Sequence, residues 1–373
     1  MINALQTVQA QFRHRLRFVQ QMLSPPAIAV VGAYHYENVG DMALAAVGRA
    51  HWPGPVQPAL QTSANIAKWP GQPITLVCGG AIITEDFIVQ LRHRYGQNPE
   101  RLGLIGMELA RSPNPLTHDS VAFLASLPFV AFRNSDQISL FSDYGLPGAP
   151  RLIPDIVFAA PFASNQSIQS ADTSISPHPL QSATGPQVLG VNITAGTGRD
   201  RDLSRTERAT IRDVKRTFFR AAVEDALGRG WQVEHVPFAI SDDYAAREVL
   251  DGLSVRFAPF TSDPTKVFAR IARMSAFAPS RYHALIFAIL AGLPVTPFLY
   301  ARKNYWLAAD FLPGLEPFGF REALDDPSPD KIRRHAGQFW SLSAASGAEL
   351  RTEVKDAFRD AFDAISQTDV SAA

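Results

Sequence analysis

The sequence predicts an α/β protein built from two halves, and three observations support this prediction. Short apolar stretches bounded by glycine, proline or polar residues alternate with segments of helical periodicity along most of the chain. Such alternation is typical of mainly parallel sheets with crossover helices. A Ser/Gln/Pro-rich tract without a period, residues 163–187, interrupts it once. At 373 residues, the chain is long enough for two domains of ordinary size.

Five segments follow from this pattern. Residues 1–24 carry apolar residues at helical spacing with three arginines among them. This helix either packs on the body of the protein or on a second subunit, or lies as a basic amphipathic helix on a membrane surface. Residues 25–162 form the first α/β domain, 163–187 a mobile linker, 188–330 the second domain, and 331–373 a C-terminal helical segment. Two halves joined by a linker would leave a cleft between them, which is a favoured place for a ligand.

The expected elements of the first half are short apolar strands and one clear helix. The strands are 27–33, 74–78 (ending in a glycine pair), 103–106 and 129–132, and the helix runs from Asp41 through Arg49. In the second half the alternation of strands and helices is more regular. The strands are 188–193, 232–238, 255–257, 276–279 and 294–300, and the helices are 204–229, 242–252, 264–274, 281–291 and 348–366.

Composition excludes several classes of function. Formal net charge is zero and 19% of residues are charged, so neither a nucleic-acid partner nor an acidic interaction tail is expected. The one cysteine, Cys78, lies in a buried-strand pattern, cannot form an intrachain disulfide and fits a reducing compartment. No signal peptide is recognisable, and the longest apolar run, about 284–300, is broken by glycine and proline. We therefore expect a cytoplasmic location.

The strongest candidate site is the segment Ser280-Arg281-Tyr282-His283. It joins a short buried strand to an otherwise apolar helix, at the edge where parallel sheets bind ligands. A helix N-terminus favours anions, and an imidazole titrates near neutral pH. Lys303 follows the next expected strand and would share this anion site, although a lone lysine is usually a solvated charge. We predict His283 as an acid–base group and Arg281 and Lys303 as anion ligands.

The first half offers weaker candidates. Asn38, Gly40 and Asp41 lie in the loop between the first strand and its helix, where they form either a capped structural turn or a binding loop. Gly79 and Gly80 allow either close strand–helix packing or close approach of a substrate.

Two charged residues follow later strands of the first half. Arg133 comes directly after the strand 129–132, and is either a surface ion-pair partner or an anion clamp. Asp155 precedes an apolar stretch, where a turn or cap role is favoured over a ligand-binding one. The sequence has no His-Glu-x-x-His motif, no cysteine pair and no Gly-x-Ser-x-Gly motif, so a metal site and a hydrolase nucleophile have no support.

Together these segments resemble the polysaccharide pyruvyl transferase family. The matching motifs are the N-x-G-D loop at Asn38–Asp41, the glycine pair at Gly79-Gly80, an R-x-x-S-like segment at Arg133, the turn Pro154-Asp155, S-R-x-H-A at Ser280–Ala284, Gly292-x-Pro294, and the later Lys303. They are spread over about residues 27–305. Two departures stand out: Tyr282 replaces the usual Leu, and the strand ending at Phe238 lacks a His that many relatives show.

The resemblance implies two Rossmann-like domains in a GT-B-like arrangement. It also implies transfer of a pyruvyl group from phosphoenolpyruvate to a sugar, forming a cyclic ketal, with no further cofactor. Arg133, Arg281 and Lys303 would then hold the carboxylate and phosphate of this donor, and His283 would transfer the proton. The acceptor would be a saccharide of polysaccharide or exopolysaccharide biosynthesis; a lipid-linked one would bring the N-terminal helix to the inner face of a membrane.

Two other functions compete. One is a nucleotide-sugar glycosyltransferase with a GT-B fold, which often has E-A-x-x-x-G-x-P-V at the corresponding helix. Phe287 stands where the ribose-binding Glu would be, which argues against nucleotide-sugar binding there. The other is a non-catalytic relative that kept the fold. The presence of Arg281, His283 and Lys303 together argues against this alternative.

Overall fold

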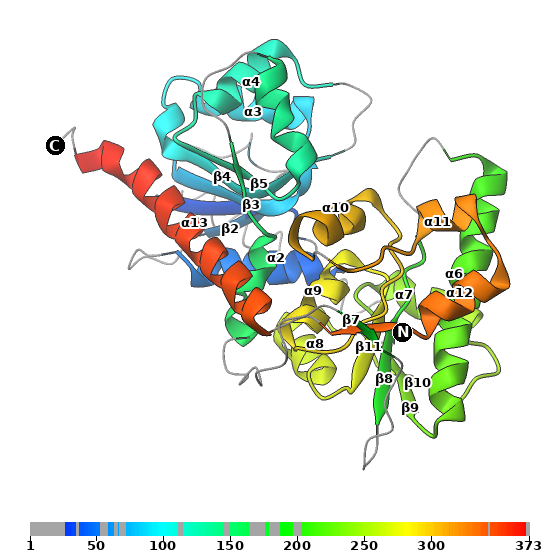
Figure 1. Cartoon of the computed structure of the whole chain (residues 1–373). Helices are drawn as coiled ribbons and strands as arrows, with labels where there is room; N and C mark the ends of the chain where they lie inside the picture. Colours follow the sequence, from blue (N-terminus) through cyan, green and yellow to red (C-terminus); the bar gives the residue numbers. More distant parts are fainter. Residues whose placement is uncertain are drawn as a thin grey trace. The chain divides into compact units, whose positions relative to one another are not determined.

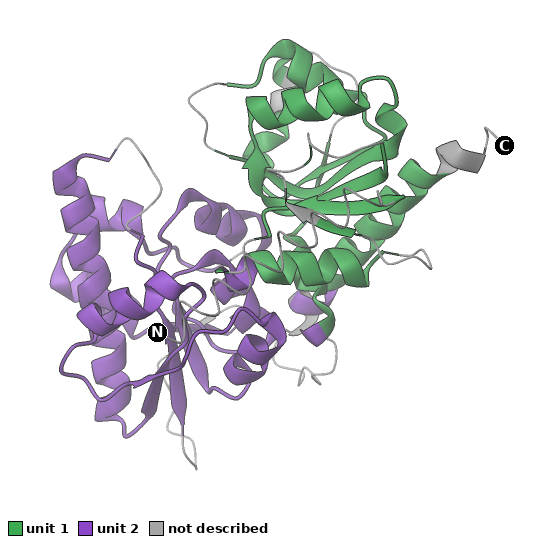
Figure 2. Ribbon diagram, turned by 180° about the vertical axis from the view of Figure 1, so that it is seen from behind, with its two compact units in different colours: residues 1–37, 41–161, 350–373 green, residues 38–40, 162–349 purple. Residues whose placement is uncertain are grey.

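The computed structural model describes residues 27–34, 37–52, 59–62, 66, 72–110, 115–144, 150–163, 176–178, 187–196, 203–312, 314–341 and 344–370. The helix expected in residues 1–24 lies outside them. The chain divides into two compact units (Figure 2). Unit 1 comprises Met1–Glu37, Asp41–Pro161 and Leu350–Ala373, and unit 2 comprises Asn38–Gly40 and Phe162–Glu349.

Unit 1 contains a six-stranded sheet in which every neighbouring pair of strands is parallel. Its order is β2-β1-β3-β4-β5-β6. The strands are β1 Ile28–Gly32, β2 Ala59–Thr62, β3 Ile74–Ile83, β4 Leu102–Leu109, β5 Phe129–Phe132 and β6 Arg151–Leu152. The order reverses between β1 and β3, as in doubly wound folds.

Helices cover both faces of this sheet (Figure 1). On one face lie α3 Glu85–Tyr95 and α4 His118–Ala125; on the other lie α2 Val39–Ala50 and the C-terminal helix α13 Ala344–Val370. The short elements are α5 Ser139–Asp143 and the 3-10 turns η2 Pro99–Arg101, η3 Ser135–Gln137, η4 Ile156–Ala159 and η5 Pro161–Ala163. Threonine caps begin two helices: Thr84 accepts the Phe87 N–H, and Thr117 accepts the Ser120 N–H.

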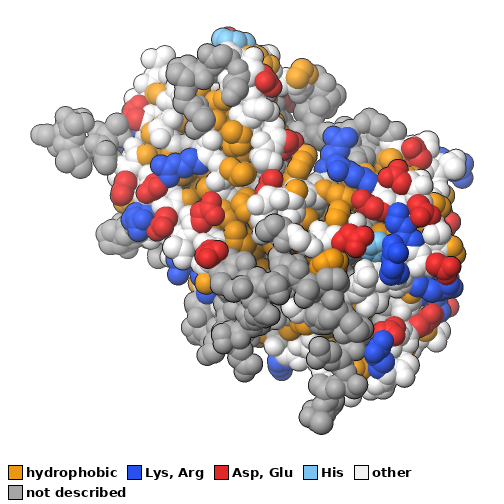
Figure 3. Space-filling model, in the orientation of Figure 1, with side chains coloured by type: hydrophobic (Ala, Val, Ile, Leu, Met, Phe, Trp, Pro, Cys, Tyr) orange, Lys and Arg blue, Asp and Glu red, His pale blue; other side chains and the backbone are white. Residues whose placement is uncertain are grey.

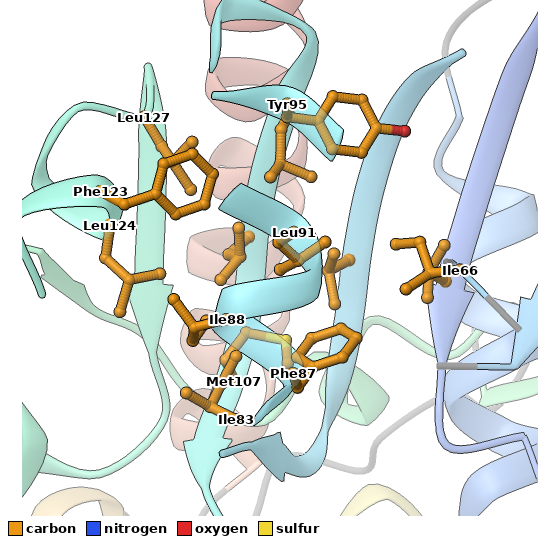
Figure 4. Close-up of a cluster of buried hydrophobic side chains, with 14 of the residues drawn as sticks. Ile66, Ile83, Phe87, Ile88, Leu91, Tyr95, Met107, Phe123, Leu124 and Leu127 are labelled. Carbon is orange, nitrogen blue, oxygen red and sulfur yellow. The ribbon is translucent and has the colours of Figure 1, made fainter. Parts of the chain in front are cut away.

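Apolar side chains fill the space between the sheet and α3–α4 (Figure 4). Ile88 and Leu91 of α3 and Met107 of β4 are fully buried in this cluster. The Tyr95 hydroxyl is satisfied inside it by the Thr75 hydroxyl at 2.7 Å. Cys78 is also fully buried, in β3, and burial raises the pKa of its thiol, in agreement with the packing role expected from the sequence.

Unit 2 contains a parallel four-stranded sheet of order β10-β9-β8-β11. These strands are β8 Val188–Asn192, β9 Gln232–His235, β10 Arg256–Phe257 and β11 Ala276–Pro279, and a separate antiparallel pair joins β7 Ser176–His178 to β12 Phe339–Ser341. The helices are α6 Arg205–Gly228, α7 Ile240–Val249, α8 Pro264–Ile271, α9 Tyr282–Leu290, α10 Arg302–Phe311, α11 Phe320–Asp325 and α12 Pro329–Ala336. A complete capping box, Ser204 with Glu207, begins the long α6.

The prediction of an α/β chain with two Rossmann-like domains is confirmed, since each unit has its own parallel sheet with helices. The observed division differs from the expected segments at the C-terminus. Residues 331–349, with α12 and β12, belong to unit 2, whereas the chain from Leu350 onward belongs to unit 1. The apolar face of α13 explains this, because Ile365 packs against Gly103 of the unit 1 sheet.

Three expected elements need correction. The tract 163–187 is not linker throughout, because it contains β7, which pairs with β12. The strand 74–78 continues through its glycine pair to Ile83. The stretch 294–300 is not a regular strand: it runs beside β11 with hydrogen bonds such as Phe277 N–H to Pro294 O (2.9 Å), but prolines at 294 and 297 have no N–H to continue the ladder.

Candidate functional site

The carboxyl ends of three neighbouring strands meet in unit 2. β8 lies between β9 and β11, so the chain order reverses at β8, and ligands of open parallel sheets bind beside such a reversal. Asn192 ends β8, Asp242 lies in the first turn of the helix after β9, and Ser280 and Arg281 follow β11. The topology therefore brings together polar side chains that are up to 89 positions apart.

Arg281 lies at the N-cap position of α9 and is held on two sides. Its backbone N–H donates to Asn192 Oδ1 at 3.0 Å. Its guanidinium donates through Nε and Nη2 to the fully buried carboxylate of Asp242, with the shortest contacts at 2.6 Å. The side chain is 16% exposed. The predicted anion ligand is thus already paired with a protein carboxylate, and its remaining capacity for an anion is smaller than the sequence suggested.

Asp242 is the residue that organises this corner. Besides Arg281, its Oδ2 accepts the backbone N–H groups of Phe238 (3.0 Å) and Ala239 (3.1 Å) and the Asn192 amide at 3.4 Å. A carboxylate with this many donors can be buried in its ionised form. Asp242 thereby fixes the ends of β8 and β9 to the start of α9.

His283 lies one residue further along, in the first turn of α9, with 8% of its surface exposed. Its ring lies against Gly40: a Cβ atom added at Gly40 would be 1.9 Å from His283 Nδ1. Only glycine leaves room for the imidazole at this point. Two residues 243 positions apart, both predicted as site residues, are therefore in direct contact within unit 2.

The start of α2, which carries Gly40, is attached to the carboxyl edge of the unit 2 sheet. Val39 N–H donates to Phe238 O at 2.9 Å, and Asn38 forms a β-bridge with Ala239. Asn38 Oδ1 accepts the Gly40 N–H at 2.9 Å, which is the geometry of a helix cap. Asn38 rather than Asp41 caps α2, because the helix begins at Val39 and places Asp41 inside its first turn.

Lys303 and Tyr282 form a second contact at this site. Lys303 Nζ lies 5.1 Å from the centre of the Tyr282 ring, at the N-terminal turn of α10. The Tyr282 ring in turn meets the His283 ring edge to face, with centroids 5.2 Å apart. Tyr282 is 2% exposed, so it packs and positions its two neighbours rather than narrowing an open pocket. Lys303 thus stays with the Arg281–His283 segment, as predicted.

The predicted residues of unit 1 form a different arrangement. Arg133, after β5, is 1% exposed and forms ion pairs with both Glu108 and Asp155. Asp155 also accepts the Val157 N–H at 2.9 Å, so its expected cap role is confirmed. Arg133 is an ion-pair partner, but a buried one and not the surface partner expected from the sequence, because its guanidinium faces two carboxylates inside the unit.

The glycine pair has a packing role. Gly79 and Gly80 both have positive φ angles, 65° and 95°, which non-glycine residues rarely adopt. A Cβ atom at Gly79 would be 2.5 Å from Leu44 of α2, so the pair allows close contact between β3 and that helix. Of the two roles expected for this pair, the structure shows close strand–helix packing.

Two buried titratable groups lie near the unit 2 edge. His235, at the end of β9, is fully buried, and both its ring nitrogens lack a hydrogen-bond partner among the described residues. Burial lowers its pKa to about 4, against smaller opposing effects of Asp242 and Asp243. Lys215 of α6 is 3% exposed, and burial lowers its pKa to about 8. Sequence reasoning missed Lys215, because its position within a basic helix gives no sign that it turns inward.

Asn192 and Asp242 were also missed as site residues, although a signal existed. Asn192 is the first polar residue of β8, and Asp242 is the first charged residue after β9; both lie at the carboxyl edge of a parallel sheet, which is where ligands and their supporting groups gather. No group of three or more His, Cys, Asp or Glu side chains that could hold a metal ion occurs among the described residues. Within the same residues, no helix is both long and apolar enough to span a membrane.

Comparison with known proteins gives no family. No family model matches the chain, and no curated protein matches it. Solved structures of similar fold include UDP-GlcNAc 2-epimerase from Neisseria meningitidis bound to UDP-GlcNAc (10% identity, 89% of this chain and 98% of that chain, TM-score 0.46). Others are an α,α-trehalose-phosphate synthase (UDP-forming) from Burkholderia vietnamiensis (13%, 83% and 74%, 0.42) and the spinosyn rhamnosyltransferase SpnG with spinosyn aglycone (13%, 93% and 100%, 0.39). Sequence identities and TM-scores this low indicate only a general likeness of α/β folds.

Proposed function

We propose that this chain is a transferase that acts on sugars, with a phosphate-bearing donor and with His283 as the acid–base group. For the donor we propose phosphoenolpyruvate. The observation that carries the proposal is the contact between Gly40 and His283. It joins the N-x-G-D loop to the S-R-x-H-A segment, the two motifs on which the resemblance to pyruvyl transferases chiefly depends.

The chemistry requires one well-placed proton carrier and cationic groups for the donor. Protonation of C3 of phosphoenolpyruvate generates an oxocarbenium-like centre at C2, which a sugar hydroxyl attacks. The C2–O bond breaks, and phosphate leaves with the bridging oxygen and the electron pair of that bond. A second hydroxyl then closes the cyclic ketal at C2. The two hydroxyl protons replace the one consumed at C3 and the one taken by phosphate. His283, at the N-terminus of α9, is suited to transfer these protons.

The donor site differs from the one expected from sequence. Arg133 belongs to a buried ion-pair cluster, so the proposal assigns the donor to Lys303, the N-terminal turns of α9 and α10, and the exposed part of Arg281. Lys303 is half-buried and held over Tyr282. A phosphate or carboxylate there would meet positive charge from Lys303, from the exposed part of Arg281 and from two helix ends.

The direct test is incubation with phosphoenolpyruvate and a panel of glycans, with phosphate release and mass gain on the glycan as readouts. We expect His283→Ala to lower turnover by about 10²–10⁴-fold, as for loss of a positioned acid–base group. The control is His93→Ala, which removes an exposed histidine of α3 in unit 1. Near-normal turnover of His283→Ala would refute the assignment.

A nucleotide-sugar glycosyltransferase is the second candidate. Two of the compared proteins, the UDP-forming trehalose-phosphate synthase and the UDP-GlcNAc 2-epimerase, act on uridine nucleotides, but a likeness this weak concerns the fold alone. Against it, Phe287 is fully buried among Phe162, Phe238 and Phe268, so this position has no carboxylate for a ribose. Thermal stabilisation decides between donors, because a ligand that binds only the folded state raises Tm. If Tm rises with UDP-sugars and not with phosphoenolpyruvate, glycosyl transfer becomes the preferred function. If the protein turns over neither donor, a non-catalytic relative is favoured.

A further inference from the structure

We propose that Lys215 is a positioning residue of the candidate site. Its ammonium group fixes the loop after β8, and this loop holds the turn Ser280–Arg281 directly ahead of His283. The inference rests on the proposed function only for the catalytic role of His283. The position of Lys215 on α6, far from every motif of the sequence, gave no reason to select it.

The first step is the contact of Lys215 with the loop. Its Nζ donates to the carbonyl oxygens of Thr194 and Gly196, each at 2.8 Å. Hydrogen bonds from a charged donor are about twice as strong as neutral ones. Burying an ammonium group in a helix–sheet interface is costly, and an apolar side chain of the same size would often be cheaper. The charge is therefore best explained by the two loop carbonyl oxygens, which need a strong hydrogen-bond donor.

The second step leads from the loop to the catalytic turn. Thr194 N–H donates to Ser280 Oγ at 2.7 Å. Ser280 in turn donates twice to Asn192 O, through its hydroxyl and its backbone N–H, each at 2.9 Å. Ser280 is 1% exposed and Thr194 2% exposed, so water does not substitute for these bonds. A displaced Thr194 would leave the Ser280 hydroxyl with one protein contact in place of two.

A third contact extends the same network to the neighbouring helix. Asn304 Nδ2, in the first turn of α10, donates to Ser280 O at 3.3 Å. Lys303 precedes Asn304, so the turn at Ser280 is tied to the helix end that carries the proposed donor ligand. Lys215 thus supports both the imidazole and the cation through one serine.

The charges around Lys215 define a pH window. Asp242 and Glu248 of α7 favour its charged form, whereas Arg212 of α6 and Arg281 at α9 disfavour it. Burial is the largest effect and lowers the pKa to about 8. Above this pH the neutral amine makes weaker bonds to the two carbonyls and no longer balances Asp242. Turnover should therefore fall as pH rises through about 8.

Stability should move in the opposite direction. Between about pH 8 and the ordinary lysine pKa of 10.5, the unfolded chain binds this proton and the folded chain does not. The contribution of Lys215 to the free energy of unfolding therefore rises with pH in this window. If turnover falls between pH 8 and 10.5, deprotonation of Lys215 cannot cause this fall by unfolding the protein, because it stabilises the folded state.

The experiment compares Lys215→Met, which keeps the length of the side chain, with Arg216→Met, which removes a neighbouring exposed charge. We expect Lys215→Met to lower kcat by about 10²-fold, as for a reacting group that is displaced by about 1 Å. The KM for the donor should change less than kcat, because Lys303 is tied to Ser280 only through its neighbour Asn304. Lys215→Arg retains its charge above pH 8 and should lose the decline in turnover that the wild-type protein shows there. Arg216→Met should keep both the wild-type kcat and the wild-type pH profile.

A second readout does not need turnover. The imidazole C–H signals of His283, assigned by their loss in His283→Ala, should shift at pH 7 in Lys215→Met and stay unchanged in Arg216→Met. If phosphoenolpyruvate is not a substrate, this spectroscopic comparison still decides the positioning role. Unchanged His283 signals in a folded Lys215→Met protein would overturn the proposal. Should that variant fail to fold, a wild-type turnover profile that stays flat from pH 7 to 9 would overturn it.

Discussion

The carboxyl edges of the two sheets contain the same residue types in different roles. In unit 1, Arg133 is 1% exposed and pairs with Glu108 and Asp155 inside the unit. In unit 2, Arg281 is 16% exposed, pairs with Asp242, and stands at the start of a helix. An arginine after a buried strand is therefore not sufficient evidence for an anion site.

The two sheet edges differ in the residues that surround the ion pair of each arginine. In the unit 1 cluster the one arginine faces two protein carboxylates, so the cluster serves chiefly to hold β4, β5 and η4 together. In unit 2 the pair is followed by His283, against which Gly40 packs, and by Lys303 on the next helix. Charged and neutral surface groups are otherwise interspersed on the face drawn in Figure 3, without a large region of one sign.

The largest expected contrast is in stability. Arg133→Met would leave Glu108 and Asp155 buried without their cation, and we expect a loss of about 3–5 kcal/mol in the free energy of unfolding. Arg281→Met should cost less, because Asp242 keeps its backbone and Asn192 donors. Urea unfolding measures both.

The matched control for this contrast is Arg151→Met, which removes an exposed arginine paired with Asp360. Its effect should be about 0–1 kcal/mol, the usual value of a surface pair. An Arg133→Met protein as stable as the wild type, but unable to bind phosphoenolpyruvate, would return Arg133 to the donor site.

The unit 2 edge should also respond to acid. The unfolded chain protonates His235 below about pH 6.5, whereas the folded chain does so only below about pH 4. The contribution of His235 to stability is therefore complete above pH 6.5 and is lost as pH falls, amounting to about 3 kcal/mol by pH 4. In His235→Leu this part of the acid dependence should be absent. Parallel stability curves for the two proteins between pH 7 and 4 would contradict the assignment.

Gly40→Ala tests the contact that joins the two motifs. The added methyl group overlaps the His283 ring, so either the first turn of α2 or the imidazole must move. We expect turnover to fall by about 10²-fold, as for a displaced reacting group. Gly228→Ala is the control, because nothing lies within 4 Å of a Cβ atom there. Equal turnover of the two variants would show that the contact is not needed.

The smallest expected effect concerns Tyr282. Tyr282→Leu removes the ring under Lys303, and a partly exposed cation–π contact is worth about 0.5–1 kcal/mol. The KM for the donor should therefore rise about two- to fivefold. Tyr282→Phe keeps the ring and should behave like the wild type. A larger effect of the Phe variant than of the Leu variant would point to the hydroxyl instead.

Much of the fold followed from local patterns. The strand 129–132 is found at the predicted residues, and the helix expected at 204–229 differs from α6 by one residue at each end. Both have strong local signals, an apolar run in the first and a Ser204–Glu207 capping box in the second. Where long-range pairing decides, prediction failed: β7 gains its structure from β12, which is 161 positions away in the pairing of Phe339 with His178.

The sequence alone determined the chemistry available at the site and its place at a strand–helix junction. Arg281, His283 and Lys303 are visible there because apolar periodicity stops and charged residues begin. Only the tertiary structure decided which partners these residues have. Asp242 forms an ion pair with Arg281, and the absence of a side chain at Gly40 leaves space for the His283 ring. Lys215 points inward and donates to the loop after β8. The physical reason is that partnership depends on burial and on contacts between distant segments, and neither is encoded in the spacing of residues along one segment.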